Sequence, residues 1–385
     1  IYEVLSQTMP TSAKITGSKP VYISPHRIEE PVIRLSRANI REQIRFLLRA
    51  KKDKAKAIIF ECMALHPNYQ RVCEESIIKS KVGVITNARP DHLDVMGPTV
   101  KDVVRSLAMT VPYNGTLVTA ETKNLSVLKQ VCHERRTKLI HISEEESAKV
   151  PDNIMNKFSY IEHKENVAVA TATLTLMGVS VDRTYELITS TRPDVGALRR
   201  FEITSSMKRL KSSFINGMAA NDPESSLQIW QNAVNVVPID QTKTLHLNLR
   251  NDRADRTMTL IEQFSTLQID ELIVTGDYQD AIKCEISNKL SVKNKIYFFG
   301  KITGDELGRW LSKLEDQSRL IISIGNLGGA GYELIRYAEN NWDHDVREES
   351  AIVDLNENMK PSRKSEKHHI FKPSNKGLER EVAYA

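Results

Sequence analysis

Residues 82–97 read Val-Gly-Val-Ile-Thr-Asn-Ala-Arg-Pro-Asp-His-Leu-Asp-Val-Met-Gly, a short apolar run followed by a polar loop. The run Val82–Thr86 predicts a buried β-strand that ends at Asn87. A capped turn, with Asp94 or Thr99 capping the next helix, would explain part of the polar loop. Because loops on a rigid scaffold carry function, we interpret the segment as a functional loop. Its polar side chains are Asn87, Asp91, His92 and Asp94.

The apolar run Ala57–Phe60 predicts another buried strand, which ends at Glu61. In an open α/β sheet, ligands bind at the carboxyl ends of the strands. Glu61 and the loop after Asn87 are therefore expected at the same edge of a sheet. A carboxylate at that edge can hold Mg²⁺, which prefers oxygen ligands. The alternative is that Glu61 is a solvated residue at the end of a strand.

Strands and helices alternate along most of the chain, which predicts βαβ units and mainly parallel α/β sheets. The pattern breaks at Arg192-Pro193 and then resumes as a second alternating block. Beyond it, six basic residues and one acid lie between Lys360 and Lys376, a composition typical of a flexible tail. We therefore expect one α/β domain at 1–192, a second at 193–340 and a charged tail at 341–385.

The composition is that of a soluble globular protein. Of the 385 residues, 40% are hydrophobic, and 54 basic residues against 49 acidic ones give a net charge of +5. This excess is spread along the chain, so it does not favour a nucleic-acid partner. No apolar run approaches the roughly 20 residues that a membrane-spanning helix needs.

The segment Ile33–Leu48 predicts a basic amphipathic helix. Its arginines would form one face, which is either simply solvated or placed to steer a polyanionic molecule. The opposite, apolar face is expected to consist of Ile33, Ile40, Ile44, Leu47 and Leu48.

The two loop segments together resemble the central domain of the Mur ligase superfamily, which includes the peptidoglycan amino-acid ligases and folylpolyglutamate synthetase. The resemblance runs from residue 1 to about residue 340. It implies a central ATPase domain with a parallel sheet, followed by a C-terminal Rossmann-like α/β domain. Three longer stretches narrow it to the CapB/PgsB-type ligase of poly-γ-glutamate synthesis: Ile59-Phe-Glu-Cys-Met-Ala-Leu-His-Pro-Asn-Tyr-Gln70, Asp91-His-Leu-Asp-Val-Met-Gly-Pro98 and Thr110-Val-Pro-Tyr-Asn-Gly115.

The resemblance implies roles for the first domain. Glu61 and His92 are expected to act in catalysis as ligands of Mg²⁺. Asn87 is expected beside the ATP, while Asp91 and Asp94 would shape the loop. Asn166 matches a family asparagine near the adenine, although a helix N-cap would explain Asn166 equally well.

For the second domain, the resemblance implies two further loops. Asn216–Pro223 is similar to a Mur loop, with Ala220 where the general pattern has His, and its Asn221 and Asp222 are expected to meet the nucleotide. A strand-to-helix turn with Pro223 at the first helical position is the alternative. Asn248–Arg256 resembles a Mur segment that ends in Asp-Arg. There Asp252 would bind the ribose and Arg253 would lie near the phosphates or the substrate.

Two segments of this domain can also be explained without a function. The charged side chains of Asn248–Arg256 could instead form a surface ion-pair network. The Gly-rich stretch Ser323–Gly331 could bare backbone N–H groups to an anion or to a substrate carboxylate. Tight packing of a strand on a helix would explain the same glycines.

The sequence departs from the family in two places. The family's central domain begins with a Gly-Lys-Ser/Thr phosphate loop, and no such motif occurs in these 385 residues. We expect the loop, and a membrane-anchoring segment, upstream of Ile1. Many Mur ligases also carry a carbamylated lysine before the glycine turn, whereas Val103–Gly115 contains Arg105 and no lysine.

The implied reaction is an ATP-dependent γ-glutamyl amide ligation through an acyl phosphate, with release of ADP. Implied partners are glutamate, the growing poly-γ-glutamate chain and a small membrane subunit, at the cytoplasmic face of the membrane. Two alternatives remain open. One is another Mur-type ligase acting on folate or peptidoglycan precursors, and the other is a non-catalytic subunit without a phosphate loop.

Overall fold

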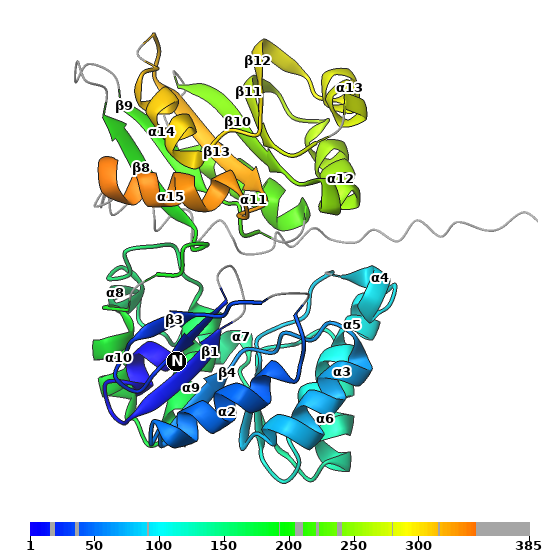
Figure 1. Ribbon diagram of the computed structural model, residues 1–385, viewed down its shortest axis with the longest axis vertical. Coiled ribbons are helices and arrows are strands. Elements are labelled where there is room, and N and C mark those ends of the chain that lie inside the picture. The colour runs from blue at the N-terminus through cyan, green and yellow to red at the C-terminus, as the bar shows by residue number, and fades with distance from the viewer. Residues whose placement is uncertain are drawn as a thin grey trace, which may run out of the picture.

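The chain forms two lobes, shown in Figure 1 of this computed structural model. The N-terminal lobe runs from α1 to α10 and the C-terminal lobe from β8 to α15. The predicted boundary at 192 falls in the connection between α10 and β8, and it stays a prediction. The side chains of Thr204, Val236, Asp252 and Asp255 are not described. The structure describes residues 1–15, 20–34, 38–90, 92–191, 193–204, 211–220, 223–236, 241–278, 280–314 and 316–343.

The N-terminal lobe alternates short strands and helices. Its strands are β1 (Thr11–Ile15), β2 (Val21–Ile23), β3 (Glu29–Pro31), β4 (Ala57–Phe60), β5 (Val82–Ile85), β6 (Thr116–Thr119) and β7 (Lys138–His141). Its helices and helical turns are α1 (Tyr2–Leu5), α2 (Glu42–Lys52), α3 (Pro67–Val72), η1 (Cys73–Ile78), α4 (Leu93–Met96), α5 (Val100–Leu107), η2 (Ala108–Thr110), α6 (Leu125–Glu134), α7 (Glu144–Ala148), α8 (Asp152–Met155), α9 (Lys164–Leu176) and α10 (Val181–Ile188).

These strands form two sheets, with the orders β3-β2-β1-β4 and β5-β6-β7. The second sheet is parallel, as is the pair β1–β4, but β2 pairs antiparallel with both β1 and β3. Short connections join β1 to β2 and β2 to β3, and such connections permit only antiparallel pairing, because parallel strands need a long crossover. The expectation of a mainly parallel sheet therefore fails at this edge of the lobe.

Helix α9 joins the two sheets. Val167 and Leu174 of α9 belong to the hydrophobic cluster that packs against Ile59 of β4. Val169 belongs to the cluster with Val118 of β6. Both sheets therefore bury an apolar face on the same helix, which fixes the carboxyl end of β4 relative to that of β5.

The predicted helix over Ile33–Leu48 is wrong in its start and in its buried face. Helix α2 begins at Glu42, and its buried residues are Gln43, Phe46 and Ala50. Ile44 and Leu48 are instead exposed. The reason is that α2 packs through charges: the Glu42 carboxylate pairs with the buried Lys14 amine at 3.1 Å and with the Arg34 guanidinium at 2.7 Å. Apolar periodicity cannot reveal that arrangement.

The C-terminal lobe is a six-stranded sheet with helices on both faces. The sheet order is β12-β11-β10-β13-β9-β8, and every neighbouring pair is parallel except β8–β9. Its strands are β8 (Arg199–Thr204), β9 (Lys211–Asn216), β10 (Thr242–Leu249), β11 (Ile269–Gly276), β12 (Val292–Gly300) and β13 (Arg319–Gly325). Its helices and helical turns are α11 (Pro223–Val236), η3 (Asn251–Arg253), α12 (Ala254–Phe264), α13 (Asp280–Lys289), α14 (Gly304–Ser312) and α15 (Ala330–Asn341).

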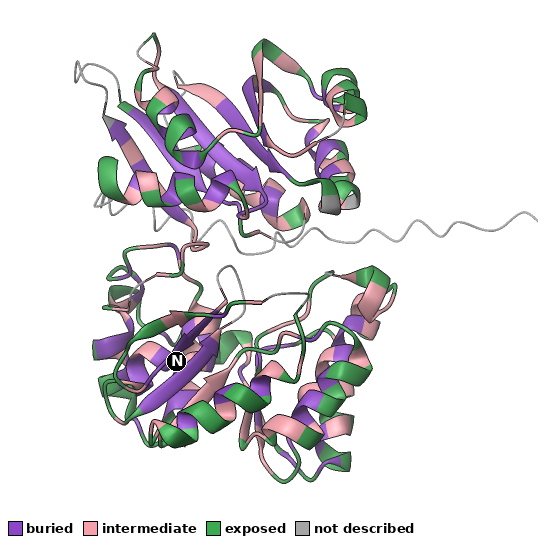
Figure 2. Ribbon diagram, viewed as in Figure 1, coloured by how far each residue is buried: buried purple, intermediate pink, exposed green. Residues whose placement is uncertain are grey.

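Alternating strand residues build a core on each face of this sheet. Leu245 and Leu247 of β10 face a cluster that contains Trp230 of α11 and Phe264 of α12. Ile321 of β13 lies in the opposite cluster, with residues of α14 and α15. Figure 2 shows the buried strands between helices whose outer sides are exposed. This is the α/β architecture predicted for residues 193–340.

A buried histidine lies at the centre of the sheet. His246 of β10 is 1% exposed, and its ring nitrogens lie 2.7 Å from Ser323 Oγ and 2.8 Å from Thr275 Oγ1. Burial lowers the pKa of His246 from 6.5 to about 3, because the charged ring would lose its hydration. The folded lobe therefore keeps this ring neutral at pH values at which the unfolded chain takes up a proton.

When the pH is lowered from 8 to 5, we expect protonation of this ring in the unfolded chain to reduce the free energy of unfolding of the lobe by about 2 kcal/mol. The pKa is depressed in the folded state, so the contribution is present above pH 6.5 and is lost as the pH falls towards 3. Tryptophan fluorescence during urea unfolding measures it, because Trp230, Trp310 and Trp342 all lie in this lobe. His246→Gln is the matched control and should lose about 2 kcal/mol less over the same range. Equal pH dependence of the two proteins would contradict this assignment.

Candidate functional site

The loop after β5 is held to helix α9 by a side-chain hydrogen bond. Asn87 Nδ2 donates to Glu165 Oε1 at 2.8 Å, and Glu165 lies in the first turn of α9. The next residue along α9 is Asn166, whose side-chain amide donates to Glu162 Oε1 at 2.8 Å. The N-cap of α9 is His163, so the N-cap alternative for Asn166 is wrong. Asn87 and the start of α9 thus lie together.

A buried carboxylate fixes the backbone of the same loop. Glu121, just beyond β6, is 4% exposed and accepts a hydrogen bond from Ala88 N–H at 2.8 Å. Its other oxygen accepts one from Asn124 N–H, also at 2.8 Å. Glu121 was missed at the level of sequence. Its signal was an acid at the end of a third short apolar strand, the pattern that identified Glu61.

Glu61 directly follows β4 and is exposed. Its backbone N–H donates to Lys14 O at 3.0 Å, which extends the pairing between β1 and β4 by one residue. The Lys14 side chain is fully buried on the face that packs under α2. Burial lowers the pKa of Lys14, and Glu42 and, more weakly, Glu61 oppose that shift by favouring the charged amine. The Glu61 carboxylate thus lies in the field of a buried cation.

His92 has an unusual backbone conformation. With φ 48° and ψ 43° it lies in the left-handed region, which non-glycine residues seldom adopt, and it precedes α4. Conformations of this kind concentrate at functional sites. Thr99, and not Asp94, caps helix α5, with Asp102 completing a capping box. Asp91 lies outside the described residues.

The loops of the C-terminal lobe gather at the carboxyl ends of β9, β10 and β13, which are neighbours in the sheet. Arg256 Nη2 donates to the carbonyl oxygens of Ala220 and, at 2.8 Å, of Gly325. Asn248 Nδ2 donates to Asn326 O at 2.5 Å and to Gly328 O at 3.0 Å. The Gly-rich turn is therefore fastened to the loops beside it.

Three residues of this lobe were predicted to contact the nucleotide or the substrate. Arg253 ends η3 and is half-buried, at the start of α12. Asp252 lies in the same turn, although its side chain is not described. Asn221, like its neighbour Asp222, lies outside the described residues. The roles given to Asn221, Asp252 and Arg253 stay predictions.

The two sets of loops meet across the lobes. Arg89 Nη1, in the loop after β5, donates to Ser225 Oγ at 2.8 Å. Ser225 lies in the first turn of α11, directly after the 216–220 loop. A second bond, from Ile161 N–H to Leu198 O at 3.0 Å, lies close to the connection between the lobes. The arrangement places the carboxyl edge of the second N-terminal sheet opposite that of the C-terminal sheet.

The carboxylate of Glu61 is a suitable ligand for a hard cation such as Mg²⁺ if water and substrate phosphates supply the remaining ligands. Mg²⁺ is usually bound by one or two carboxylates together with water and substrate phosphates. Glu61, exposed at a strand end, supplies such a carboxylate. Among the described residues, no three His, Cys, Asp or Glu side chains are gathered closely enough to hold a metal ion by themselves.

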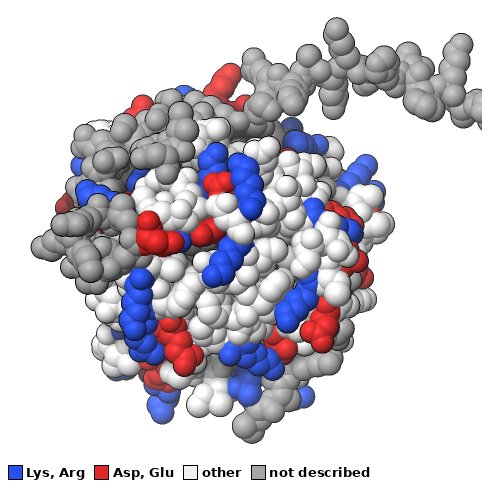
Figure 3. Space-filling model, turned by 90° about the horizontal axis from the view of Figure 1, so that it is seen from above, with Lys and Arg blue, Asp and Glu red and all other residues white. Residues whose placement is uncertain are grey.

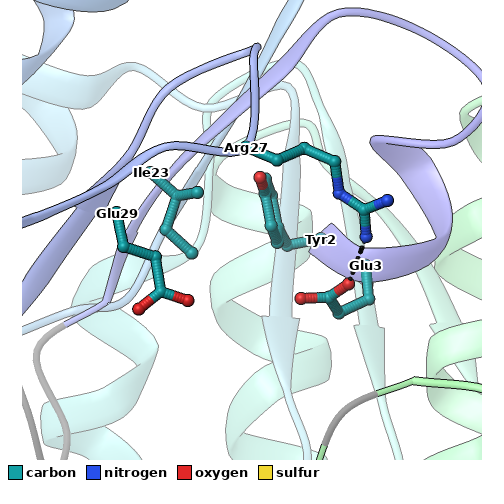
Figure 4. Close-up of a pocket in the computed structure, with 5 residues that line it drawn as sticks. All are labelled: Tyr2, Glu3, Ile23, Arg27 and Glu29. Atoms are coloured by element: carbon teal, nitrogen blue, oxygen red, sulfur yellow. Dashed lines mark hydrogen bonds and ion pairs between the residues drawn. The ribbon is translucent and has the colours of Figure 1, made fainter.

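A separate pocket lies in the N-terminal lobe (Figure 4). It is lined by Tyr2 and Glu3 of α1, Ile23 of β2, and Arg27 and Glu29 beyond it. The Arg27 guanidinium pairs with the Glu3 carboxylate at 2.8 Å beside it. None of the predicted site residues lines this pocket.

Comparison with known proteins places the chain in a family. It is 31% identical over 342 residues to the capsule biosynthesis protein CapB of Bacillus anthracis, spanning 87% of this chain and 70% of that protein. It is 30% identical over 340 residues to the PGA synthase CapB of Bacillus subtilis (strain 168), spanning 87% of this chain and 82% of that protein. The chain belongs to the CapB family. CapB-type proteins are ATP-dependent amide ligases of the Mur superfamily, and residues 1–183 match the model of the Mur ligase middle domain. Residues 203–341 match that of the poly-gamma-glutamate synthase CapB C-terminal domain.

Solved structures show the same fold. Escherichia coli FolC in complex with ADP aligns with a TM-score of 0.65 at 12% identity, over 88% of this chain and 85% of that one. Folylpolyglutamate synthase from Thermotoga maritima aligns with a TM-score of 0.56 at 12% identity, over 88% and 84% of the two chains. At this identity the likeness establishes the shared fold of this chain and not its substrate.

Glu121→Gln should loosen the loop after β5. The Gln side chain accepts with one atom only, so one of the N–H groups of Ala88 and Asn124 would face another donor, at a cost of about 1–3 kcal/mol. Hydrogen exchange of the backbone amides of residues 86–89 should accelerate roughly tenfold or more. Glu134→Gln, at the exposed end of α6, is the matched control and should leave the rate unchanged. Unaltered exchange at Ala88 in Glu121→Gln would show that this carboxylate does not fix the loop.

Proposed function

We propose that this CapB-family chain is the ligase that extends poly-γ-glutamate, using ATP, a divalent metal and glutamate. The family supplies the reaction class. The contact between Arg89 and Ser225 carries the assignment of the site, because it brings the loop of Asn87 and His92 against the start of α11. A ligase that joins two acids needs such a place, where nucleotide and substrate groups meet between two halves of the protein.

The proposed reaction divides amide formation into two steps. A glutamyl carboxylate first takes the γ-phosphoryl group of ATP and becomes an acyl phosphate, which releases ADP. The amine of an incoming glutamate then attacks the acyl carbon and loses a proton, an amide forms, and phosphate leaves with the bonding electrons of the C–O bond. Water would hydrolyse the acyl phosphate, so the site must exclude it.

Residues of both lobes have roles in this proposal. Glu61 and His92 would hold Mg²⁺, which offsets the charge that develops as two anions approach. Asn87 and Asn166 would bind the nucleotide from the N-terminal lobe, where the hydrogen bond from Asn87 to Glu165 brings them together. Asn221, Asp252 and Arg253 would meet the ribose and phosphates from the other lobe. Residues 1–192 and 193–340 would be the two domains that close.

The proposed location is the cytoplasmic face of the membrane, with a small membrane subunit as partner. Among the described residues, no helix is both long and apolar enough to cross a bilayer. The support for this location is the analogy with the CapB family.

Glu61→Gln and His92→Ala should each abolish glutamate-dependent ADP release by the full-length protein, with a loss of at least 100-fold in kcat. Gln keeps the shape of Glu61 but removes the charge that a divalent cation needs. The matched controls are Glu134→Gln and His133→Ala, both exposed on α6. Circular dichroism should be unchanged in all four proteins. Wild-type turnover in either site variant would remove that residue from the proposed metal site.

Arg89→Ala and Ser225→Ala should each reduce kcat/KM about fivefold, the equivalent of one lost hydrogen bond. Since both residues serve one contact, the double variant should lose no more than either single variant. Arg105→Ala is the control, because Arg105 pairs within α5 with Asp102 at 2.8 Å. Additive losses in the double variant would show that the two side chains act separately.

A further inference from the structure

Helix α2 carries exposed aliphatic side chains surrounded by cations. Ile44 is 44% exposed and Leu48 63% exposed, and the two are four residues apart on one face of the helix. Exposed basic residues lie on the same side at helical spacing: Arg41, Arg45, Lys51 and Lys52. We call Arg41, Ile44, Arg45, Leu48, Lys51 and Lys52 the α2 face. Figures 1 and 2 show α2 on the outside of the N-terminal lobe, with its outer side exposed.

The opposite side of α2 is anchored strongly. Glu42 pairs with Lys14 and Arg34 at its first turn. Phe46 stacks on Tyr22 with ring centroids 5.2 Å apart. At the far end, Asp53 accepts hydrogen bonds from Tyr22 Oη at 3.1 Å and from Arg49 at 3.0 Å. The helix therefore cannot turn to bury Ile44 and Leu48, and the α2 face is presented outward by the fold.

A further aliphatic side chain lies beside the first turn of this helix. Ile33 is 75% exposed, and the next residue, Arg34, donates to Glu42 through Nε at 3.1 Å and Nη2 at 2.7 Å. This contact holds the segment on the side of α2 that carries Glu42, so the α2 face itself consists of Ile44, Leu48 and the basic residues around them. Singly scattered aliphatic side chains are normal on a protein surface, but a group of them within a ring of cations is not.

The charged residues of the α2 face are all basic. Among the described residues, the ion pairs of α2 involve Glu42 and Arg49, and none is described for Arg41, Arg45, Lys51 or Lys52. On the end of the C-terminal lobe, in contrast, basic and acidic side chains are interspersed (Figure 3). A helix that combines outward aliphatic residues with a Lys- and Arg-rich surround matches the chemistry of the interface of an anionic bilayer.

We infer that the α2 face docks this protein on an anionic lipid surface. The cations would lie at the headgroups, and the two aliphatic side chains would enter the boundary with the acyl chains. A soluble polyanion would use the cations but gain nothing from Ile44 and Leu48. A second protein would favour a shaped or aromatic patch, whereas this face is one convex helix. The inference goes beyond the proposed ligase activity and does not require it.

The test is co-sedimentation of the full-length protein with vesicles at low ionic strength. Vesicles of phosphatidylcholine with one third phosphatidylglycerol should bind the protein, and pure phosphatidylcholine should not. Arg45→Glu with Lys52→Glu should weaken binding at least 25-fold, from roughly fivefold per cation removed. Ile44→Ser with Leu48→Ser should weaken it roughly tenfold or more. High salt should release the wild-type protein.

Control variants distinguish a specific effect of the α2 face from a general effect of changed net charge or lost aliphatic surface. Lys123→Glu with Lys129→Glu makes the same change in net charge at exposed positions near and on α6 and should leave binding unchanged. Leu176→Ser with Val181→Ser does the same for exposed aliphatic residues elsewhere in the lobe. Arg45→Lys with Leu48→Ile should retain binding. Circular dichroism of each variant shows that it is folded.

Three results would overturn the inference. One is equal binding of face and control variants to anionic vesicles, or no binding at all. Another is binding of soluble poly-γ-glutamate that the charge variant abolishes and the Ser variant leaves intact. The third is a concentration-dependent dimer in sedimentation velocity that the Ser variant dissociates. Glu61→Gln separates this question from the ligase proposal, because it should lose ADP release and still bind vesicles.

Discussion

The loop after β5 is fixed by hydrogen bonds within its own lobe and also contacts the other lobe, and the site depends on this arrangement. Glu121 holds the backbone of Ala88, and Glu165 of α9 accepts from Asn87. Arg89 reaches Ser225 in the other lobe. A loop has no ladder of its own to order it, so ordering each residue would otherwise cost about 1–2 kcal/mol of backbone entropy. These bonds offset that cost and leave His92 at a defined place after them.

The buried Lys14 performs a comparable role for the first sheet. An unpaired charge in that position would be strongly destabilising. Here one carboxylate, Glu42, compensates two cations, Lys14 and Arg34, and so fastens α2 to the sheet. The carbonyl of Lys14 also accepts the backbone N–H of Glu61. The packing of α2 and the position of the proposed metal ligand therefore depend on the same residue of β1.

The sequence predicted correctly those elements whose apolar residues form a clear local pattern. The strands around Ala57–Phe60 and Val82–Ile85 lie where they were predicted, because buried strands leave clear apolar runs. The prediction failed at α2, whose contacts are mainly charged and aromatic, and at the antiparallel β2, whose direction follows from short connections. Both failures concern interactions between segments, which a local pattern does not contain.

The candidate site divides in the same way. Glu61 was found because it is an acid directly after an apolar strand, and Asn87 and His92 because they belong to a polar loop that follows another strand. Glu121 was missed although it lies in the same kind of position, because an acid followed by Thr122, Lys123 and Asn124 looks like part of an ordinary surface turn. Only the structure shows that both of its oxygens accept backbone N–H groups. The contact from Arg89 to Ser225 joins residues 136 positions apart, so no spacing rule could predict it.

The weakness of that contact has a consequence for how the two lobes can work. A single hydrogen bond at an exposed position contributes about 1 kcal/mol, so thermal motion can break it readily. The bond from Ile161 to Leu198 lies close to the connection and would persist through a rotation about it. Lobes joined in this way are expected to move relative to each other. A ligase that must admit two acids and a nucleotide, and then exclude water, requires a site with this property. The hydrogen bonds within each lobe, from Glu121, Glu165 and Arg256, keep each half of the site in shape while the distance between the halves changes.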